Sequence, residues 1–363
     1  MSMVRTYNFN PGPAALPLEV LEQAKEELVE YEGRGMSITE MSHRSPVYER
    51  VHEETQELLR ELLQLPSTYR VLLMGGGASA QFALLPMNFL TPDRAGAYVL
   101  TGSFSEKAYE EARTVGTAVA VASTKLQQWA CLPQPEDIVV PPDAAYVHLT
   151  TNNTIEGSQF TAFPETGEVP LIGDMTSDLL SRDIELSPFS MMYAGAQKNL
   201  GPAGVTVVLL REELLEQASE QIPAILRYKT FAANNSLYNT PPVHAVYMMR
   251  LVLQWAKRQG GVAALEQRNR EKARRIYEVI DGSGGFYQGV IETPYRSMMN
   301  ITWRMASEEL EQRFVAESEQ HGFDGLAGHR SVGGLRASAY NAVPLAACEA
   351  LADFMRAFQE RHG

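Results

Sequence analysis

The sequence predicts an α/β protein whose larger part is a mostly parallel, doubly wound sheet and whose C-terminal part is a smaller α+β domain. Short apolar segments of strand length alternate with segments of helical periodicity over the first two thirds of the chain. This alternation is typical of parallel sheets that are covered by helices on both faces. After about Gly260 the alternation gives way to a long charged helix and isolated strands, which indicates a second domain.

The N-terminal region combines an extended arm with two helices. The arm, Asn8–Pro13, is rich in turn residues, and we expect it to lie over another part of the protein. Apolar residues on one helical face predict a first helix from Pro17 to about Tyr31. After a loop over 35–45, a second helix is predicted from Pro46 to about Gln64, with Ser45 as its N-cap.

Six apolar segments have the length and composition of buried strands. They are Tyr69–Met74, Ala97–Thr101, Thr117–Ala122, Ala145–Thr150, Pro170–Asp174 and Val205–Leu210. Helix-like segments follow the first strand, through Asn88, and the second, around 106–113. Beyond Gln259–Gly261 the pattern predicts helices over 262–280, 307–321 and 344–358 and a strand over 298–305.

Length and composition limit the classes of function. The chain has 363 residues, of which 45% are hydrophobic, so it can bury a large core. Two cysteines, Cys131 and Cys348, are too few and too far apart for a disulfide framework, and we expect a cytoplasmic protein. Met1–Pro17 lacks a signal-peptide core, and no apolar run reaches the roughly 18 residues that span a membrane. The net charge of −13 disfavours nucleic-acid binding, which requires a basic face.

One lysine is placed in an unusual setting. Lys198 lies among the small residues of Met192–Gly204, directly before an apolar run, and desolvation there would lower its pKa and free its amine. Asp174 ends a predicted strand, where α/β sheets place ligand-binding groups. Pyridoxal phosphate requires such a pair, because a lysine binds its aldehyde as a Schiff base and an acid keeps its ring nitrogen protonated. An exposed lysine and an unconnected aspartate are the competing interpretation.

Three further features fit a planar, phosphorylated ligand. The backbone N–H groups of Gly75–Ser79 follow a strand and open a helix, so they can converge on a phosphate, although a tight turn explains them equally well. Phe104 lies past a strand end and can stack on a ring or belong to the core. Thr154 can donate a hydrogen bond to a ring oxygen or serve as an ordinary turn residue.

Basic residues gather at a few positions of this acidic chain, namely His43, Arg44, His329, Arg330 and Arg336. Arginine binds carboxylate and phosphate groups bidentately, so two cationic spots would suit a ligand with two negative ends. Surface ion pairs are the competing interpretation. The remaining histidines, which are His52, His148, His244 and His321, lack the spacing of a zinc site, and no metal site is predicted.

Together these motifs resemble the phosphoserine aminotransferase family, a branch of the class V aminotransferases with the type I fold of pyridoxal phosphate enzymes. The resemblance runs essentially end to end. Its segments are Asn8–Pro13, Met41–Ser45, Gly75–Ser79, Thr101–Lys107, Gly173–Asp174, Ala196–Gly204, Asn239–Pro242, Gly328–Arg330 and Gly333–Ser338. It implies a large domain over 16–258 with a mostly parallel seven-stranded sheet, and a small α+β domain formed by 1–15 and 259–363.

The resemblance also implies a role for each candidate residue. Lys198 would form the internal aldimine with pyridoxal 5'-phosphate, Asp174 would pair with the ring nitrogen, and Thr154 would meet the ring oxygen. The cofactor phosphate would be bound by Ala78, Ser79 and Gln197, joined by Asn239 and Thr240 from the second subunit of a homodimer with one cofactor per subunit. Phe104 stands where many family members stack a tryptophan. Arg336 would hold the α-carboxylate, and His43, Arg44, His329 and Arg330 would form the side-chain anion pocket.

The implied reaction is amino transfer from L-glutamate to 3-phosphohydroxypyruvate, which gives 2-oxoglutarate and O-phospho-L-serine in serine biosynthesis. Use of 4-phosphohydroxy-L-threonine, in vitamin B6 biosynthesis, stays open. An alanine- or serine:glyoxylate-type class V enzyme, or a cysteine desulfurase, would share Lys198 and Asp174 but lack the paired His-Arg loops, and Cys131 has no desulfurase setting. A non-catalytic pyridoxal phosphate binder would need no substrate clamp.

Overall fold

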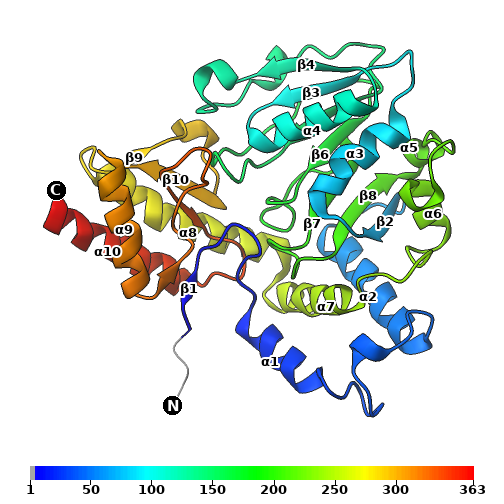
Figure 1. Ribbon diagram of the computed structural model, residues 1–363, viewed down its shortest axis with the longest axis horizontal. Helices are drawn as coiled ribbons and strands as arrows, with labels where there is room; N and C mark the ends of the chain where they lie inside the picture. The colour runs from blue at the N-terminus through cyan, green and yellow to red at the C-terminus, as the bar shows by residue number, and fades with distance from the viewer. Residues whose placement is uncertain (1–4) are drawn as a thin grey trace.

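The central element is a seven-stranded sheet in the order β2-β8-β7-β6-β5-β3-β4 (Figure 1). The computed structural model describes residues 5–363, so the first four residues of the predicted segments Met1–Pro17 and 1–15 lie outside the described residues. The strands are β2 (Tyr69–Met74), β3 (Gly96–Leu100), β4 (Ala118–Ser123), β5 (Tyr146–Thr150), β6 (Leu171–Asp174), β7 (Phe189–Gly195) and β8 (Thr206–Arg211). Only β8 runs antiparallel to its two neighbours, which confirms the prediction of a mostly parallel sheet.

All six strands predicted for the first two thirds of the chain are present, and their ends differ by at most one residue. The additional strand is β7, between β6 and β8. It ends in Tyr193, Ala194 and Gly195, and alanine and glycine are residue types that strands disfavour. The pattern therefore indicated only a stretch of small residues before Lys198, whereas tertiary packing makes it a buried strand.

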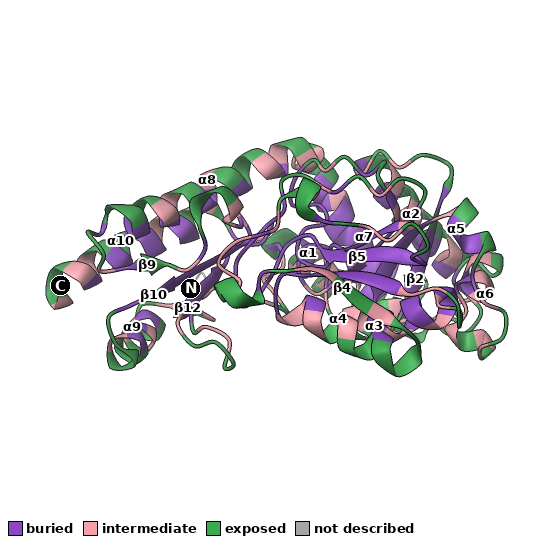
Figure 2. Ribbon diagram, turned by 90° about the horizontal axis from the view of Figure 1, so that it is seen from above, coloured by how far each residue is buried: buried purple, intermediate pink, exposed green. Residues whose placement is uncertain are grey.

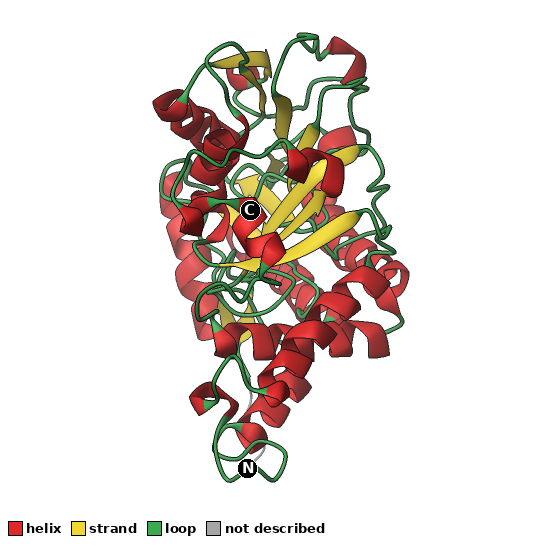
Figure 3. Ribbon diagram, turned by 90° about the vertical axis from the view of Figure 1, so that its right-hand side faces the viewer, coloured by secondary structure: helices red, strands yellow, loops and turns green. Residues whose placement is uncertain are grey.

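Helices cover both faces of the sheet (Figure 3). They are α1 (Leu18–Glu27), α2 (Pro46–Leu62), α3 (Gly77–Phe89), α4 (Ser103–Val115), α5 (Glu212–Glu216), α6 (Tyr228–Ala233) and α7 (Val243–Arg258). Alternate side chains of β2 divide between two cores: Val71 and Leu73 pack with α2 and α7, and Leu72 and Met74 pack with α3 and α6. Short 3₁₀ helices lie at Ile38–Glu40, Lys125–Gln127, Pro135–Asp137, Ala224–Leu226 and Thr293–Tyr295.

The predicted start of α2 is confirmed. The side chain of Ser45 accepts a hydrogen bond of 3.3 Å from the N–H of Tyr48, and Pro46 occupies the first helical position, where its missing N–H costs nothing. The prediction for the first helix is wrong at its C-terminal end, because α1 stops at Glu27, before the predicted Tyr31.

The C-terminal part builds a third core beside the sheet (Figure 2). Its elements are α8 (Gly261–Gly282), β9 (Gln288–Gly289), β10 (Asn300–Arg304), α9 (Glu308–Gln320), β11 (Phe323–Asp324), β12 (Leu335–Ser338) and α10 (Leu345–His362). Strands β12, β10 and β9 form an antiparallel sheet, and Trp303 and Phe314 are fully buried in the core.

The N-terminal arm packs on this C-terminal part. Strand β1 (Tyr7–Asn8) pairs in parallel with β11, and Phe9 is fully buried in the C-terminal core. The backbone N–H of Ala14 then donates to the carbonyl of Gln197 at 2.9 Å, so the arm crosses the loop that carries Lys198. The predicted extended arm is therefore confirmed, while the domain boundaries at 15/16 and 258/259 stay a prediction. Within residues 5–363, none of the helices is both long and apolar enough to cross a bilayer.

Candidate active site

A cavity of about 460 Å³ lies at the carboxyl ends of β5 and β6. Open parallel sheets place their ligands at this end of the strands. Nine of the predicted site residues line it, namely Ala78, Ser79, Phe104, Thr154, Asp174, Gln197, Lys198, His329 and Arg336. They come from both the seven-stranded sheet and the C-terminal part, so the cavity lies between these two parts of the chain.

Lys198 reaches the cavity from the turn that follows β7. The side chain is only 8% exposed, its amine donates to the hydroxyl of Thr154, and it lies 5.6 Å from the centre of the Phe104 ring. Burial lowers the pKa of Lys198 to about 7; Asp174 opposes this shift and Arg336 adds to it. A large fraction of the amine is therefore unprotonated and nucleophilic near neutral pH.

Asp174 is the last residue of β6 and is almost fully buried. Its Oδ1 accepts a hydrogen bond of 3.0 Å from the N–H of Thr176. Burial raises the pKa of the Asp174 carboxyl, while the Thr176 hydrogen bonds and the Lys198 charge oppose the shift. A cationic partner in the cavity would stabilise the carboxylate further, because opposite charges attract strongly at a buried site.

The glycine turn after β2 opens helix α3 toward the cavity. Gly76 and Gly77 have φ angles of +92° and +65°, in the left-handed region that residues with a Cβ rarely adopt. Ala78 and Ser79 follow in the first turn of this helix of 13 residues, where backbone N–H groups have no partner within the helix. This is an arrangement that binds phosphate through N–H groups and the positive end of the helix.

Arg336 enters the cavity from β12. It is 4% exposed and donates through Nη1 to the backbone carbonyl of Thr154 at 3.0 Å, whereas its Nε has no hydrogen-bond partner. No carboxylate within the described residues forms an ion pair with it. A buried guanidinium with free donors is suited to bind the carboxylate of a ligand.

Five predicted residues lie away from the cavity, namely His43, Arg44, Arg330, Asn239 and Thr240. Asn239 and Thr240 are exposed and line a separate, largely apolar cavity of about 420 Å³. His43 is half-buried, and its Nε2 has no hydrogen-bond partner, while Arg44 and Arg330 are exposed. Within one chain, these residues do not meet Lys198.

The cavity also contains residues that the sequence analysis did not single out, among them Pro11, Gly12, Asn152, Thr176 and Ser177. Their position in the sequence could have indicated a place at the site, because Asn152 follows β5, and Thr176 and Ser177 follow β6. Pro11 and Gly12 belong to the predicted arm, which covers the cavity.

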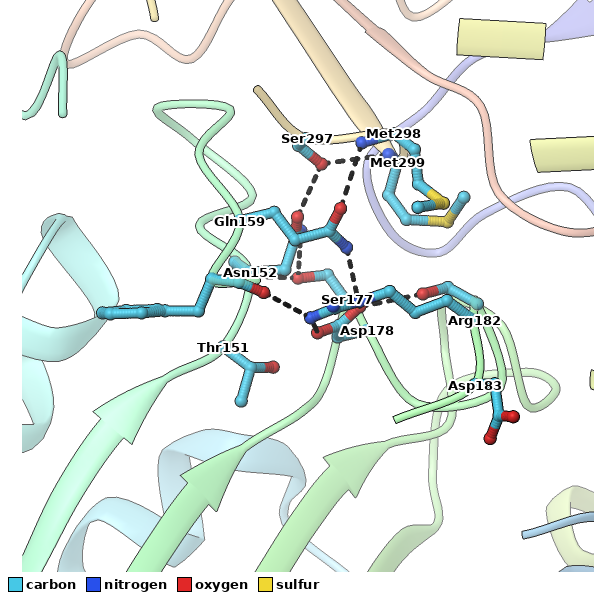
Figure 4. Close-up of polar contacts among 12 residues, drawn as sticks. Thr151, Asn152, Gln159, Ser177, Asp178, Arg182, Asp183, Ser297, Met298 and Met299 are labelled. Atoms are coloured by element: carbon cyan, nitrogen blue, oxygen red, sulfur yellow. Dashed lines mark hydrogen bonds and ion pairs between the residues drawn. The ribbon is translucent and has the colours of Figure 1, made fainter. Parts of the chain in front are cut away.

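Asn152 joins three segments around the cavity (Figure 4). Its Nδ2 donates to Ser177 after β6 and to Asn300 of β10, both at 2.8 Å, and its Oδ1 accepts from Ser297 at 2.5 Å. Beside it, the buried carboxylate of Asp178 accepts from both Arg182 and Gln159. These contacts fix the loops after β5 and β6 against the C-terminal part. No group of three metal-binding side chains is found among residues 5–363.

Comparison with known proteins assigns this architecture to a family. The family model described as "Aminotransferase class-V" matches residues 6–351. The chain belongs to the class V aminotransferase family. Similar curated class V relatives include the phosphoserine aminotransferase of Niallia circulans, which is 56% identical over 99% of both chains. That of Bacillus subtilis strain 168 is 49% identical over 99% of this chain and 100% of its own.

Solved structures of aminotransferases share this fold. Phosphoserine aminotransferase from Bacillus circulans subsp. alkalophilus has a TM-score of 0.98 and 56% identity, with 99% of each chain covered. The enzyme from Trichomonas vaginalis, described as PLP bound, has a TM-score of 0.92 and 37% identity over 97% of this chain and 100% of that chain. Alanine–glyoxylate aminotransferase from Nostoc sp. shares the fold, with a TM-score of 0.75 and 17% identity.

The cavity of this class V aminotransferase fits pyridoxal phosphate in charge and chemistry. Lys198 supplies an amine of lowered pKa for an aldehyde, and Asp174 supplies a buried carboxylate for a ring nitrogen. The first turn of α3, with Ala78 and Ser79, supplies N–H groups for a phosphate, and Phe104 supplies an aromatic face. The aldehyde, the ring nitrogen and the phosphate of the cofactor thus each have a complementary group among residues that line one cavity.

Proposed function

We propose that this class V aminotransferase catalyses reversible amino transfer between L-glutamate and 3-phosphohydroxypyruvate, with 2-oxoglutarate and O-phospho-L-serine as products. The activity depends on pyridoxal 5'-phosphate and serves L-serine biosynthesis. Support comes from the relatives named phosphoserine aminotransferase, which match nearly the whole chain at 49–56% identity.

The observation that carries the proposal within the structure is the position of Arg336 in the same cavity as Lys198. Both substrates that bring or receive the amino group carry an α-carboxylate. The Nε of Arg336 is buried without a partner, so binding a carboxylate there would satisfy a donor that otherwise costs free energy. A non-catalytic cofactor carrier has no need for such a group.

Lys198 has two roles in the proposed mechanism. When bound, the cofactor supplies a conjugated ring that withdraws electrons from the substrate Cα. The Lys198 amine would hold the cofactor aldehyde; when free, it would act as the base that removes the proton from the substrate Cα and as the acid that later returns it. Its pKa of about 7 suits both proton removal and proton return, because the amine is easily protonated and deprotonated near neutral pH.

The other residues of the cavity would hold and orient the cofactor and the substrate. With the cofactor bound, Asp174 would keep a proton at the ring nitrogen, Thr154 would donate to the ring oxygen, and Phe104 would offer an aromatic face to the ring. Gln197 joins Ala78 and Ser79 at the phosphate. His329 lies in the cavity, where burial and the charges of Arg336, Lys107 and Arg330 lower its pKa, so a bound anion would favour its protonation.

A homodimer completes the site in this proposal. Asn239 and Thr240, which are exposed in one chain, would reach the phosphate of the second subunit's cofactor. His43, Arg44, His329 and Arg330 would provide the pocket for the substrate's side-chain anion, which is a carboxylate in glutamate and a phosphate in phosphoserine. We further propose the cytoplasm as its location and domains of 16–258 and of 1–15 with 259–363.

The decisive experiment mixes the purified protein with cofactor, phosphoserine and 2-oxoglutarate and measures the glutamate formed. We expect turnover by the wild type and none by Lys198→Ala, which also loses the visible absorbance of the lysine-bound cofactor. Lys125→Ala, at an exposed lysine, is the matched control and retains activity. Steady-state turnover by Lys198→Ala would refute the role of the lysine. A wild type that reacts with alanine and glyoxylate but not with phosphoserine would refute the substrate.

A further inference from the structure

Glu156 is a buried carboxylate beside the active site that the proposed mechanism leaves without a role. It lies in the loop after β5 and is 6% exposed. Its Oε1 accepts two hydrogen bonds from Ser103, one from the backbone N–H at 2.8 Å and one from the hydroxyl at 2.7 Å. Its Oε2 has no partner. Burying a carboxylate with one oxygen unpaired costs folding free energy, and such groups often have a functional role.

The two hydrogen bonds fix the first turn of α4. Ser103 is the first residue of that helix, and Phe104 is the second. The carboxylate stands at the positive end of the helix, where a negative charge is favourable. Because the ring of Phe104 lies 5.6 Å from the Lys198 amine, the position of Ser103 determines where an aromatic face is presented in the cavity.

The loop around Glu156 also contacts the Arg336 side chain and the strand β10, which pairs with the strand of Arg336. The carbonyl of Glu156 accepts from the hydroxyl of Thr302 on β10 at 2.7 Å, and the carbonyl of Thr154 accepts from Arg336 at 3.0 Å. Thr302 is paired with Arg336 between the antiparallel strands β10 and β12. One short loop thus contacts both Ser103, the residue before Phe104, and the side chain of Arg336.

The Glu156 carboxylate packs so closely against Gly102 that no side chain fits at position 102. A Cβ at Gly102, the residue before α4, would lie 2.4 Å from Oε2 of Glu156 and 2.8 Å from Oδ1 of Asn153. Gly102 has an extended backbone, so its lack of a side chain is required by this close approach rather than by its φ angle. The carboxylate is therefore held in one place from several sides.

We propose that Glu156 is a positioning residue, which sets the Phe104 face and the Arg336 guanidinium relative to each other within the cavity. Glu156 is not among the residues that line the cavity, and it acts through Ser103 and through the strand pair β10 and β12. This role rests on the proposed function. It predicts that the hydrogen-bond acceptor at position 156 matters more than its charge.

The test compares Glu156→Gln, which keeps an acceptor of the same size, with Glu156→Ala, which removes it. The first readout is the visible circular dichroism of the bound cofactor, which reports the asymmetric surroundings of its ring. The second is 2-oxoglutarate binding by calorimetry, and the third is kcat and KM for glutamate. We expect Glu156→Gln to stay within a few-fold of the wild type and Glu156→Ala to lose about 100-fold in kcat/KM, as for a small misplacement of reacting groups.

Ser103→Ala provides a second variant if Glu156→Ala does not fold. It removes the hydroxyl donor and keeps the backbone N–H, so we expect the same change in circular dichroism with a loss of about tenfold or less. Wild-type dichroism and 2-oxoglutarate affinity in Glu156→Ala would overturn the proposal, as would equal losses in Glu156→Gln and Glu156→Ala. A wild type that is inactive toward phosphoserine would refute the proposed function instead, because the dichroism of the three variants is measured without substrate.

Discussion

The backbone N–H of Asn341 donates a hydrogen bond of 3.0 Å to Oδ1 of Asn199. Asn199 directly follows Lys198, and Asn341 lies shortly after β12, which carries Arg336. The side chain of Asn341 continues the link, because its Nδ2 donates to the carbonyl of Leu180 at 2.9 Å. The two residues thus connect the turn that carries Lys198 to the segment that follows the strand of Arg336.

The first prediction concerns this contact. Asn199→Ala removes the acceptor and leaves the N–H of Asn341 buried without a partner, so we expect a loss of about 1–3 kcal/mol in the free energy of unfolding. Denaturant unfolding of the cofactor-free protein measures it. Asn234→Ala is the control, because its side chain makes an exposed contact within its own helix region, and it should change stability by less than about 0.5 kcal/mol. Equal stability of the two variants would contradict the structural role of the Asn341 contact.

Arg336→Lys tests the carboxylate-binding site. Lysine keeps the positive charge but loses the planar fork that binds a carboxylate through two parallel hydrogen bonds. We expect KM to rise about 10-fold to 100-fold for both glutamate and phosphoserine, while the bound cofactor keeps its absorbance. Arg313→Lys, at an exposed position of α9, is the matched control. If KM rose for only one of the two substrates, Arg336 would not be the site of the carboxylate that they share.

Asp174→Asn tests the buried carboxylate. Asparagine preserves the size of the side chain and an acceptor for the N–H of Thr176, but it carries no charge for a protonated ring nitrogen. We expect turnover to fall by about 100-fold or more, the scale that electrostatic groups contribute at an active site. Single-turnover kinetics would locate the loss in proton removal rather than in substrate binding. Asp93→Asn, at an exposed loop position, should behave as the wild type.

Strand ends made much of the site predictable from the sequence. Asp174, Phe104 and Thr154 were placed after apolar strands, and parallel strands bring such positions to one edge of a sheet. The glycine turn before Ala78 follows the same rule. Seven of the nine predicted residues at the cavity meet there for this reason, whereas His329 and Arg336 come from the C-terminal part; the individual roles of all nine stay a prediction.

Other features of the fold and the site depend on contacts between residues far apart in sequence, which a local sequence pattern cannot predict. Helix α7 was not predicted, because it is buried on several sides and its apolar residues leave no clear polar face. Glu156 has a neighbour in Ser103 that is far away in sequence, so nothing local distinguishes it from a surface glutamate. Asn239 and Thr240 are predicted by the resemblance alone, and one chain brings neither these two residues nor His43 and Arg44 to the cavity.

Lys272, on α8, gives a prediction for pH dependence. It is 1% exposed, and its amine donates to the carbonyls of Ala339, Tyr340 and Val343 at 2.9, 2.7 and 3.2 Å. Burial lowers its pKa from 10.5 to about 8; Cys348 opposes this shift and Arg268 adds to it. Between these two values the unfolded chain binds more protons than the folded protein. The free energy of unfolding should therefore rise with pH across this window, by up to about 1.4 kcal/mol per unit for this group.

Lys272→Met removes the titrating amine, so its free energy of unfolding should rise less steeply between pH 8 and 9.5 than that of the wild type. Lys198, with a pKa of about 7, contributes to the rise in both proteins when the cofactor is absent, and the comparison cancels its effect. Urea unfolding at several pH values measures the slopes, and Lys25→Met, at an exposed position of α1, should keep the wild-type slope. Identical slopes for Lys272→Met and the wild type would mean that Lys272 stays charged throughout this range, because three carbonyl acceptors outweigh the cost of its burial.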